Sequence, residues 1–193
     1  MNQAVKASLA FARLELTPQQ ERQLEAFGSW LVQEAIPAGA VGPAEADKIL
    51  DRHLADSIAY AAAWDRAPDR CWDLGTGAGL PGLVLAIVWP DCLVTLTDRS
   101  GRKIDLVSRV SRMIGLEVAT EVVGIEDIDH QLEAIVSRAA MPATRMLPHL
   151  RRLLKPGGLA VVSGSGEAVQ GYEEMAVPAG ILDHSARLLM MRG

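Results

Sequence analysis

The first third of the chain carries apolar residues at helical spacing. In the segment after Thr17, leucine and phenylalanine recur every three or four positions. Thr17 is a capping residue, the next residue is a proline suited to the first helical turn, and Gln20 can complete a capping box. The spacing predicts a helix from there to the loop 37–43, and a second amphipathic helix from about Ala44 to Trp64. Together they predict an N-terminal helical cap over residues 1–66.

After residue 67 the pattern changes to short apolar runs separated by amphipathic segments. This alternation is typical of a parallel sheet whose strands are buried on both faces by helices, so we expect an α/β, Rossmann-like core over residues 67–193 that forms one compact unit with the cap. The expected strands are Cys71–Leu74, Leu93–Thr97, Val118–Val123, Ala134–Ser137 and Leu159–Ser163. The expected helices are Leu80–Trp89, Arg102–Ile114 and Pro142–Leu154, and Ile181–Met191 can supply edge strands.

Composition narrows the class of protein. The 193 residues are 49% hydrophobic and only 4% aromatic, as expected for a globular domain with an aliphatic core. No apolar run reaches the length of a membrane span and the N-terminus lacks a signal-peptide pattern, so we expect a cytoplasmic protein without membrane association. Cys71 and Cys92 are isolated in apolar contexts, which predicts two buried, reduced thiols and neither a disulfide nor a metal site.

The charge is unevenly distributed along the chain. With a net charge of −5 and a pI of about 5.4, the chain lacks the overall positive charge typical of nucleic-acid-binding proteins. Between Arg138 and Lys155, however, five basic residues occur with no acidic residue among them. This stretch predicts either one basic face in an acidic protein or ordinary solvated helix charges, and the sequence leaves both open.

The clearest motif is the glycine-rich loop Asp73-Leu-Gly-Thr-Gly-Ala-Gly79, which lies between an expected strand and an expected helix. Glycines let the backbone turn sharply and approach a ligand without Cβ clashes. The same residues are also compatible with a simple tight turn. Asp98 favours a cofactor site, because it ends the next apolar run, where a carboxylate can accept hydrogen bonds from both hydroxyls of a ribose.

Two nucleotide cofactors suit this pattern. Gly77-Ala-Gly-Leu-Pro-Gly82 also fits the dinucleotide pattern G-x-G-x-x-G, with Asp98 roughly 20 residues downstream, as NAD binding requires. Asp73 distinguishes the two cofactors, because a carboxylate there would repel a pyrophosphate but attract the cationic methionine end of S-adenosylmethionine. The roughly 100 residues after Asp98 also leave little room for the substrate domain of a dehydrogenase. We therefore predict S-adenosylmethionine as the cofactor.

The motifs, taken in order, resemble those of the glucose-inhibited division protein B family, bacterial methyltransferases that act on guanine N7 of small-subunit ribosomal RNA. The resemblance is carried by Arg52-His-Leu-Ala-Asp-Ser57, by the glycine loop through Gly82, by Asp98 with Arg102-Lys103 after it, and by Val136-Ser-Arg-Ala139. It implies a class I S-adenosylmethionine-dependent methyltransferase fold with a mostly parallel seven-stranded sheet and helices on both faces. It also implies 16S ribosomal RNA or the small ribosomal subunit as the partner, and we expect the chain to act as a monomer.

The resemblance and the expected fold assign roles to individual residues. Arg138, after the fourth strand, is expected to be catalytic by holding a phosphate or guanine O6, and an ion pair within the fold is the alternative. His53 is expected to contact the acceptor, and the alternative is that it only makes hydrogen bonds within the cap. Glu126 and Asp127 are expected near the adenine of the cofactor, and the alternative is that they are solvated loop carboxylates. The residues expected at the cofactor are Asp73, Gly75, Thr76, Gly77, Gly79, Leu80, Asp98, Arg99, Glu126, Asp127 and Arg138. Those expected at the acceptor are His53, Ser57, Arg102, Lys103 and Arg145.

Several positions depart from the family pattern. The Trp-Asn and Asn-Leu elements of its N-terminal helices are absent, Gly124 stands where the family usually has arginine, and Ser163 stands where it usually has lysine. Because the loss of basic contacts can accompany a change of acceptor, two other hypotheses stay open. One is a methyltransferase of the same descent that acts on a small molecule. The other is a non-catalytic, ribosome-associated nucleotide-binding module.

Overall fold

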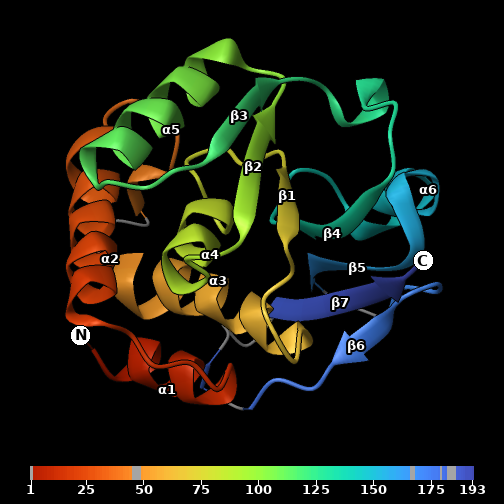
Figure 1. Cartoon of the computed structure of the whole chain (residues 1–193), viewed down its shortest axis with the longest axis horizontal. Coiled ribbons are helices and arrows are strands. Elements are labelled where there is room, and N and C mark those ends of the chain that lie inside the picture. Colours follow the sequence, from red (N-terminus) through yellow and green to blue (C-terminus); the bar gives the residue numbers. More distant parts are fainter. Residues whose placement is uncertain (1, 45–48, 166–167, 179, 182–185) are drawn as a thin grey trace.

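The computed structural model describes residues 2–44, 49–165, 168–178, 180–181 and 186–193, and in them a single β-sheet is covered by helices (Figure 1). The strands are β1 (Arg70–Leu74), β2 (Leu93–Asp98), β3 (Ala119–Val122), β4 (Leu132–Ser137), β5 (Leu154–Ser165), β6 (Glu173–Met175) and β7 (Ala186–Arg192). The α-helices are α1 (Gln3–Phe11), α2 (Pro18–Trp30), α3 (Ala55–Ala59), α4 (Gly82–Val88), α5 (Gly101–Met113) and α6 (Ala143–Leu153). Shorter π- and 3₁₀-helical segments are η1 (Leu31–Ala35), η3 (Ile49–Leu54), η4 (Tyr60–Ala63) and η5 (Ile125–Asp127).

The sheet has seven strands in the order β3-β2-β1-β4-β5-β7-β6. Neighbours from β3 to β5 are parallel, whereas β7 runs antiparallel to both β5 and β6. The strand order reverses between β1 and β4, so the connections that follow these two strands diverge and leave a crevice at their carboxyl ends. The prediction of a mostly parallel, seven-stranded α/β sheet with helices on both faces is confirmed.

Two hydrophobic clusters lie on opposite faces of the sheet. The alternation along β5 shows the division, because Leu159 and Val161 belong to one cluster while Ala160 and Val162 belong to the other. The first cluster contains α4, α5 and the N-terminal helices, and the second contains α6. Figure 1 shows α2, α3, α4 and α5 toward one side of the sheet and α6 at the other.

The N-terminal helices follow the predicted pattern at their beginning and differ from it further along. The capping box of α2 is present, since the Gln20 amide donates to Thr17 Oγ1 at 3.3 Å and the Thr17 amide donates to Gln20 Oε1 at 2.9 Å. Helix α1, capped by Asn2, was not predicted. The expected Ala44–Trp64 helix is instead a succession of η3, α3 and η4, and its residues 45–48 lie outside the described residues. The boundary at residue 66 stays a prediction.

The expected strands are present, but their ends and number differ. Strand β5 begins at Leu154, five residues before the expected start, because it already pairs there with Leu132 of β4. Strand β6 was not expected, and β7 accounts for the last apolar segment, of which residues 182–185 lie outside the described residues. Cys71 and Cys92 are both buried free thiols, as predicted. In the described part of the chain, no helix is long and apolar enough to cross a membrane.

Candidate active site

A cavity of about 640 Å³ opens at the carboxyl ends of the parallel strands. Its walls come from the segments that follow β1, β2, β3 and β4, together with part of the N-terminal cap. Ligands of open α/β folds bind at this edge of the sheet, at the point where the strand order reverses. The lining residues are Ala40, Val41, Gly42, His53, Gly75, Thr76, Gly77, Ala78, Leu80, Asp98, Arg99, Lys103, Val123, Gly124, Ile125, Glu126, Arg138, Ala139, Ala140, Met141, Pro142 and Arg145.

The glycine loop forms one wall of the cavity. Its glycines all have positive φ angles, +73° at Gly75, +58° at Gly77 and +90° at Gly79, a region in which a Cβ causes strain. The Thr76 amide donates to a carbonyl near the end of β2 at 2.8 Å, which fixes the loop against the neighbouring strand. A Cβ on Gly75 would lie 2.6 Å from the Cβ of Ala140, so the loop can approach the segment after β4 only as glycine.

Asp73 lies behind this loop and is fully buried. Its Oδ2 accepts hydrogen bonds from the Thr76 hydroxyl at 2.7 Å and from the Gly82 amide at 2.8 Å, whereas its Oδ1 has no hydrogen-bond partner among the described residues. Burial raises the pKa of Asp73 from 3.8 to about 6, although both hydrogen bonds act to lower it. Asp73 does not line the cavity but joins the two ends of the loop. Its expected contact with the cofactor stays a prediction.

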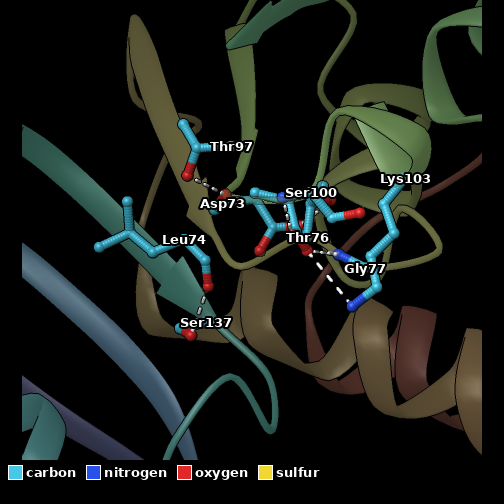
Figure 2. A network of polar contacts seen from close by, with 9 residues as sticks. Asp73, Leu74, Thr76, Gly77, Thr97, Ser100, Lys103 and Ser137 are labelled. Carbon is cyan, nitrogen blue, oxygen red and sulfur yellow. Dashed lines mark hydrogen bonds and ion pairs between the residues drawn. The ribbon is translucent and has the colours of Figure 1, made fainter. Parts of the chain in front are cut away.

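Asp98, at the end of β2, lies in the cavity wall and organises the polar groups around it. Its Oδ2 accepts a hydrogen bond from the Gly77 amide at 3.2 Å, and its Oδ1 accepts one from the Ser100 amide at 2.9 Å. The Lys103 ammonium lies 3.6 Å from Asp98 Oδ2. Figure 2 shows Thr76, Gly77, Ser100 and Lys103 gathered at this point. The carboxylate therefore faces a cavity at the tip of the second strand, the position that suits recognition of a ribose.

The turn after β3 contributes Glu126 to the cavity wall, while Asp127 does not line it. Arg152 of α6 holds this turn in place. Its guanidinium donates to the carbonyl of Ile128, to that of Ile125 at 2.8 Å and to that of Glu126 at 3.4 Å. A charged donor shared among these carbonyls restrains the turn, and with it the position of Glu126.

Arg138 follows β4 and lines the cavity. The Ser137 hydroxyl before it donates to the Leu74 carbonyl at 2.7 Å, which joins the end of β4 to the end of β1. The Arg138 guanidinium donates to the His53 carbonyl of the cap at 3.5 Å, near the limit for a hydrogen bond. Burial lowers the pKa of Arg138, and the nearby Tyr60 and Asp56 oppose this effect. A partly buried cation with one long hydrogen bond is well suited to binding an anionic or carbonyl oxygen.

Ser163 supports the turn that carries Arg138. The next residue, Ala139, has a φ of +54°, an uncommon conformation for a residue other than glycine. Its amide donates to Ser163 Oγ at 3.0 Å. Ser163 occupies the position where the family usually has lysine. In this chain the short serine side chain therefore accepts the hydrogen bond that stabilises the turn.

The structure brings most of the predicted site residues together. Those that line the cavity are Gly75, Thr76, Gly77, Leu80, Asp98, Arg99, Glu126 and Arg138 from the expected cofactor site, and His53, Lys103 and Arg145 from the expected acceptor site. Five others lie outside the lining: Asp73, Gly79, Asp127, Ser57 and Arg102. Ser57 is buried and its hydroxyl donates to the His53 carbonyl at 2.6 Å, so it supports the cap. Arg102 is exposed on α5 and lines a different groove.

Two residues of the basic stretch are engaged within the fold. Arg152 holds the turn after β3, and the Lys155 ammonium lies 2.9 Å from a carboxylate oxygen of Glu133. Arg138 and Arg145 line the cavity instead. Arg152 and Lys155 are therefore not part of a free basic face, because the fold already supplies their partners.

Two unpredicted segments of the cavity wall lie at residues 40–42 and 139–142, and Val123, Gly124 and Ile125 also line the cavity without having been predicted. Residues 40–42 lie in the loop that the sequence marked only as the end of a helix, and residues 139–142 follow Arg138. The second segment has a signal in the sequence, since any residue just after the fourth strand reaches the carboxyl edge of the sheet. The first has none, because its place depends on how the cap packs.

The residues present fit S-adenosylmethionine. The glycine loop offers a close approach to the backbone, Asp98 offers a carboxylate at the tip of β2, and Glu126 offers a second carboxylate in the wall. The unpartnered Oδ1 of Asp73 adds buried negative potential behind the loop, which suits a cationic ligand better than a pyrophosphate. Among the described residues, no group of three or more His, Cys, Asp or Glu side chains could hold a metal ion.

Solved structures with the same fold include methyltransferases. A protein from Methanococcus maripaludis assigned as an S-adenosyl-L-methionine-dependent methyltransferase matches with a TM-score of 0.58 at 14% identity, covering 72% of this chain and 84% of that one. TehB from Haemophilus influenzae matches with a TM-score of 0.52 at 14% identity, covering 71% of this chain and 61% of that one. These similarities confirm the class I methyltransferase fold.

Sequence comparison gives the family. A protein of Salinispora tropica named ribosomal RNA small subunit methyltransferase G is 35% identical over 172 residues, covering 82% of this chain and 68% of its relative. Proteins of the same name from Halorhodospira halophila and Acidothermus cellulolyticus are 33% and 34% identical, covering 89% and 69% of this chain. The alignment spans 81% of the Halorhodospira protein but 60% of the Acidothermus one. The family model GidB, described as rRNA small subunit methyltransferase G, matches residues 20–176, and the chain belongs to this family.

Proposed function

We propose that this chain is an S-adenosylmethionine-dependent methyltransferase that acts on guanine N7 of small-subunit ribosomal RNA. The observation that carries the proposal is the cavity at the carboxyl edge of the sheet, which the glycine loop, Asp98 and Arg138 all line. Family membership supports methyl transfer to ribosomal RNA as the reaction class. An RNA substrate of this kind places the reaction in the cytoplasm, and we propose that the chain acts there as a monomer.

The glycine loop, Asp98 and Glu126 form the part of the cavity that would hold the methyl donor. When bound, S-adenosylmethionine supplies a methyl group activated by a cationic sulfur. The Asp98 carboxylate can accept hydrogen bonds from ribose hydroxyls, and the positive φ angles of Gly75 and Gly77 bring backbone close to the ligand. Asp73 is buried behind the loop and keeps this backbone in place by accepting hydrogen bonds from the Thr76 hydroxyl and the Gly82 amide.

Methyl transfer to guanine N7 requires alignment more than proton transfer. The nitrogen has a lone pair and carries no proton, so none of the side chains in the cavity has to act as a general base. The protein has to place the attacking nitrogen in line with the methyl carbon and sulfur. Arg138 is suited to this task, because its guanidinium lines the cavity and can donate to guanine O6 or to a phosphate there.

Basic side chains line much of the cavity. Arg99, Lys103, Arg138 and Arg145 all line it, so four cations border a site in a chain whose net charge is −5. An anionic acceptor such as RNA fits these charges better than a neutral small molecule does. The side chains also leave a cavity of about 640 Å³, which favours an enzyme over a module that has lost its donor site.

The test is to incubate the purified chain and radiolabelled donor separately with small ribosomal subunits, naked 16S ribosomal RNA and an extract of cell metabolites. Label at guanine N7 in subunits or RNA is the expected result. Label only in small molecules, or donor binding without any transfer, would reject the proposal. An Arg138→Ala variant run in parallel distinguishes transfer at this site from a contaminating activity.

A further inference from the structure

A second hollow, formed by α5 and Ala38 of the cap, carries three arginines that the donor cavity does not use. We call it the arginine groove; its volume is about 720 Å³, and it is lined by Ala38, Arg102, Asp105, Leu106, Ser108, Arg109 and Arg112. The three arginines are exposed. They lie at positions i, i+7 and i+10 of one helix, so they share a face and span about 15 Å along its axis.

The arginines of this groove have no partners within the described chain. No hydrogen bond or ion pair joins Arg102, Arg109 or Arg112 to another described residue, and Asp105 is the one acidic residue in the lining. Lys155, by contrast, is an exposed cation with a partner, since its ammonium lies 2.9 Å from Glu133. Arg109 and Arg112 lie three residues apart, so these two like charges repel each other slightly when no anion is present. An acidic chain that leaves these three unpaired therefore offers a site for an external anion.

We propose that the arginine groove binds the phosphate backbone of the RNA substrate, next to the nucleotide that is methylated. This inference rests on the proposed function. The groove begins at Arg102, and the next residue, Lys103, lines the donor cavity, so RNA lying along α5 would lead directly to the reacting site. A nucleic-acid strand carries about one phosphate per 3.4 Å of axis, so a row of about 15 Å matches several successive phosphates. Arginine can bind each of them through paired N–H donors.

The test replaces the three charges together in Arg102→Gln/Arg109→Gln/Arg112→Gln. A control of equal charge change, Lys6→Gln/Arg13→Gln/Arg66→Gln, neutralises three exposed cations of the N-terminal cap. Binding of labelled 16S ribosomal RNA and of small subunits is measured at several salt concentrations, independently of methyl transfer. Thermal melting and titration with S-adenosylhomocysteine show whether each variant is folded and retains its donor site.

Loss of three phosphate contacts should reduce the slope of log affinity against log salt by about 2.1 to 2.7. Over a salt range from about 50 to about 200 mM, wild-type affinity should therefore fall by a factor roughly 20 to 40 times larger than that of the triple variant. The control should keep the wild-type slope. The KM for RNA should rise in the triple variant while the affinity for S-adenosylhomocysteine is unchanged.

A wild-type slope and KM in the triple variant would overturn the assignment of the groove and leave the proposed function intact. If the triple variant binds small subunits more weakly but binds naked RNA like wild type, the groove contacts a ribosomal protein, and the proposal that it binds RNA is rejected. Wild-type chain that binds RNA without methylating it would reject the proposed function alone. No RNA binding by the wild-type chain in either form would reject both.

Discussion

The buried carboxylate of Asp73 makes the stability of this protein depend on pH in a way that one substitution can isolate. Asp73 is fully buried, its Oδ2 accepts two hydrogen bonds, and burial raises its pKa from 3.8 to about 6. Asp73→Asn keeps the shape of the side chain. Its amide oxygen can still accept from Thr76 and Gly82, while its charge no longer varies with pH.

The sign follows from proton uptake. Between pH 3.8 and about 6 the folded protein holds a proton on Asp73 that the unfolded chain has lost, so the free energy of unfolding falls as pH rises through this window. The full contribution is present below pH 3.8 and is lost above about pH 6. The difference between the pKa of Asp73 in the unfolded chain and in the folded protein corresponds to about 3 kcal/mol of stability in full, because one pKa unit is about 1.4 kcal/mol. Relative to wild type, Asp73→Asn should therefore gain about 2.4 kcal/mol between pH 4 and pH 7, because part of the full difference lies below pH 4.

Urea unfolding at a series of pH values measures this difference. Groups that titrate equally in both proteins cancel, and Asp65→Asn, which removes an exposed carboxylate, serves as the control that should run parallel to wild type. Saturation with S-adenosylmethionine should reduce the pH dependence of wild type, because a cationic ligand favours the ionised carboxylate. Parallel pH profiles for wild type and Asp73→Asn would show that the reasoning from burial is wrong.

The other predictions concern the residues that shape the cavity. Arg138→Ala should lower the rate of methyl transfer far more than the affinity for the donor, since Arg138 is proposed to act on the acceptor. Steady-state kinetics measures the rate and calorimetry the affinity, and a loss of donor affinity alone would contradict this role. Arg152→Ala should lower the free energy of unfolding by about 1.5–3 kcal/mol, because the turn that carries Glu126 loses its hydrogen bonds. It should also weaken donor binding, and an unchanged affinity by calorimetry would show that this turn does not contribute to the donor site. Gly82→Ala places a Cβ 2.6 Å from Asp73 Oδ2 and 2.4 Å from Leu96 Cδ2, so a thermal melt should show a loss of about 1–3 kcal/mol; a wild-type melting temperature would mean that the site relaxes freely.

Features set by neighbouring residues were determined by the sequence alone. The capping box of Thr17 and Gln20 forms as expected because both partners lie within one helical turn. The glycine loop has the positive φ angles that its residues allow, and the alternation of apolar runs with amphipathic segments gave the parallel sheet. Asp98 lies in the cavity wall because the end of a strand adjacent to β1 must reach the same edge of the sheet.

Features that depend on contacts between distant segments were decided by the tertiary structure. Asp73 faces the loop rather than the cavity, because Gly82, nine residues away, returns its amide to the carboxylate. Arg152 and Lys155 belong to the basic stretch by sequence, but the packing of α6 and β5 brings Arg152 to backbone carbonyls and Lys155 to the carboxylate of Glu133. Arg102, Arg109 and Arg112 had no such partners brought to them, and only the folded chain shows them lining one groove. A charge in the sequence indicates what a side chain can bind, whereas packing determines whether the fold already supplies the partner.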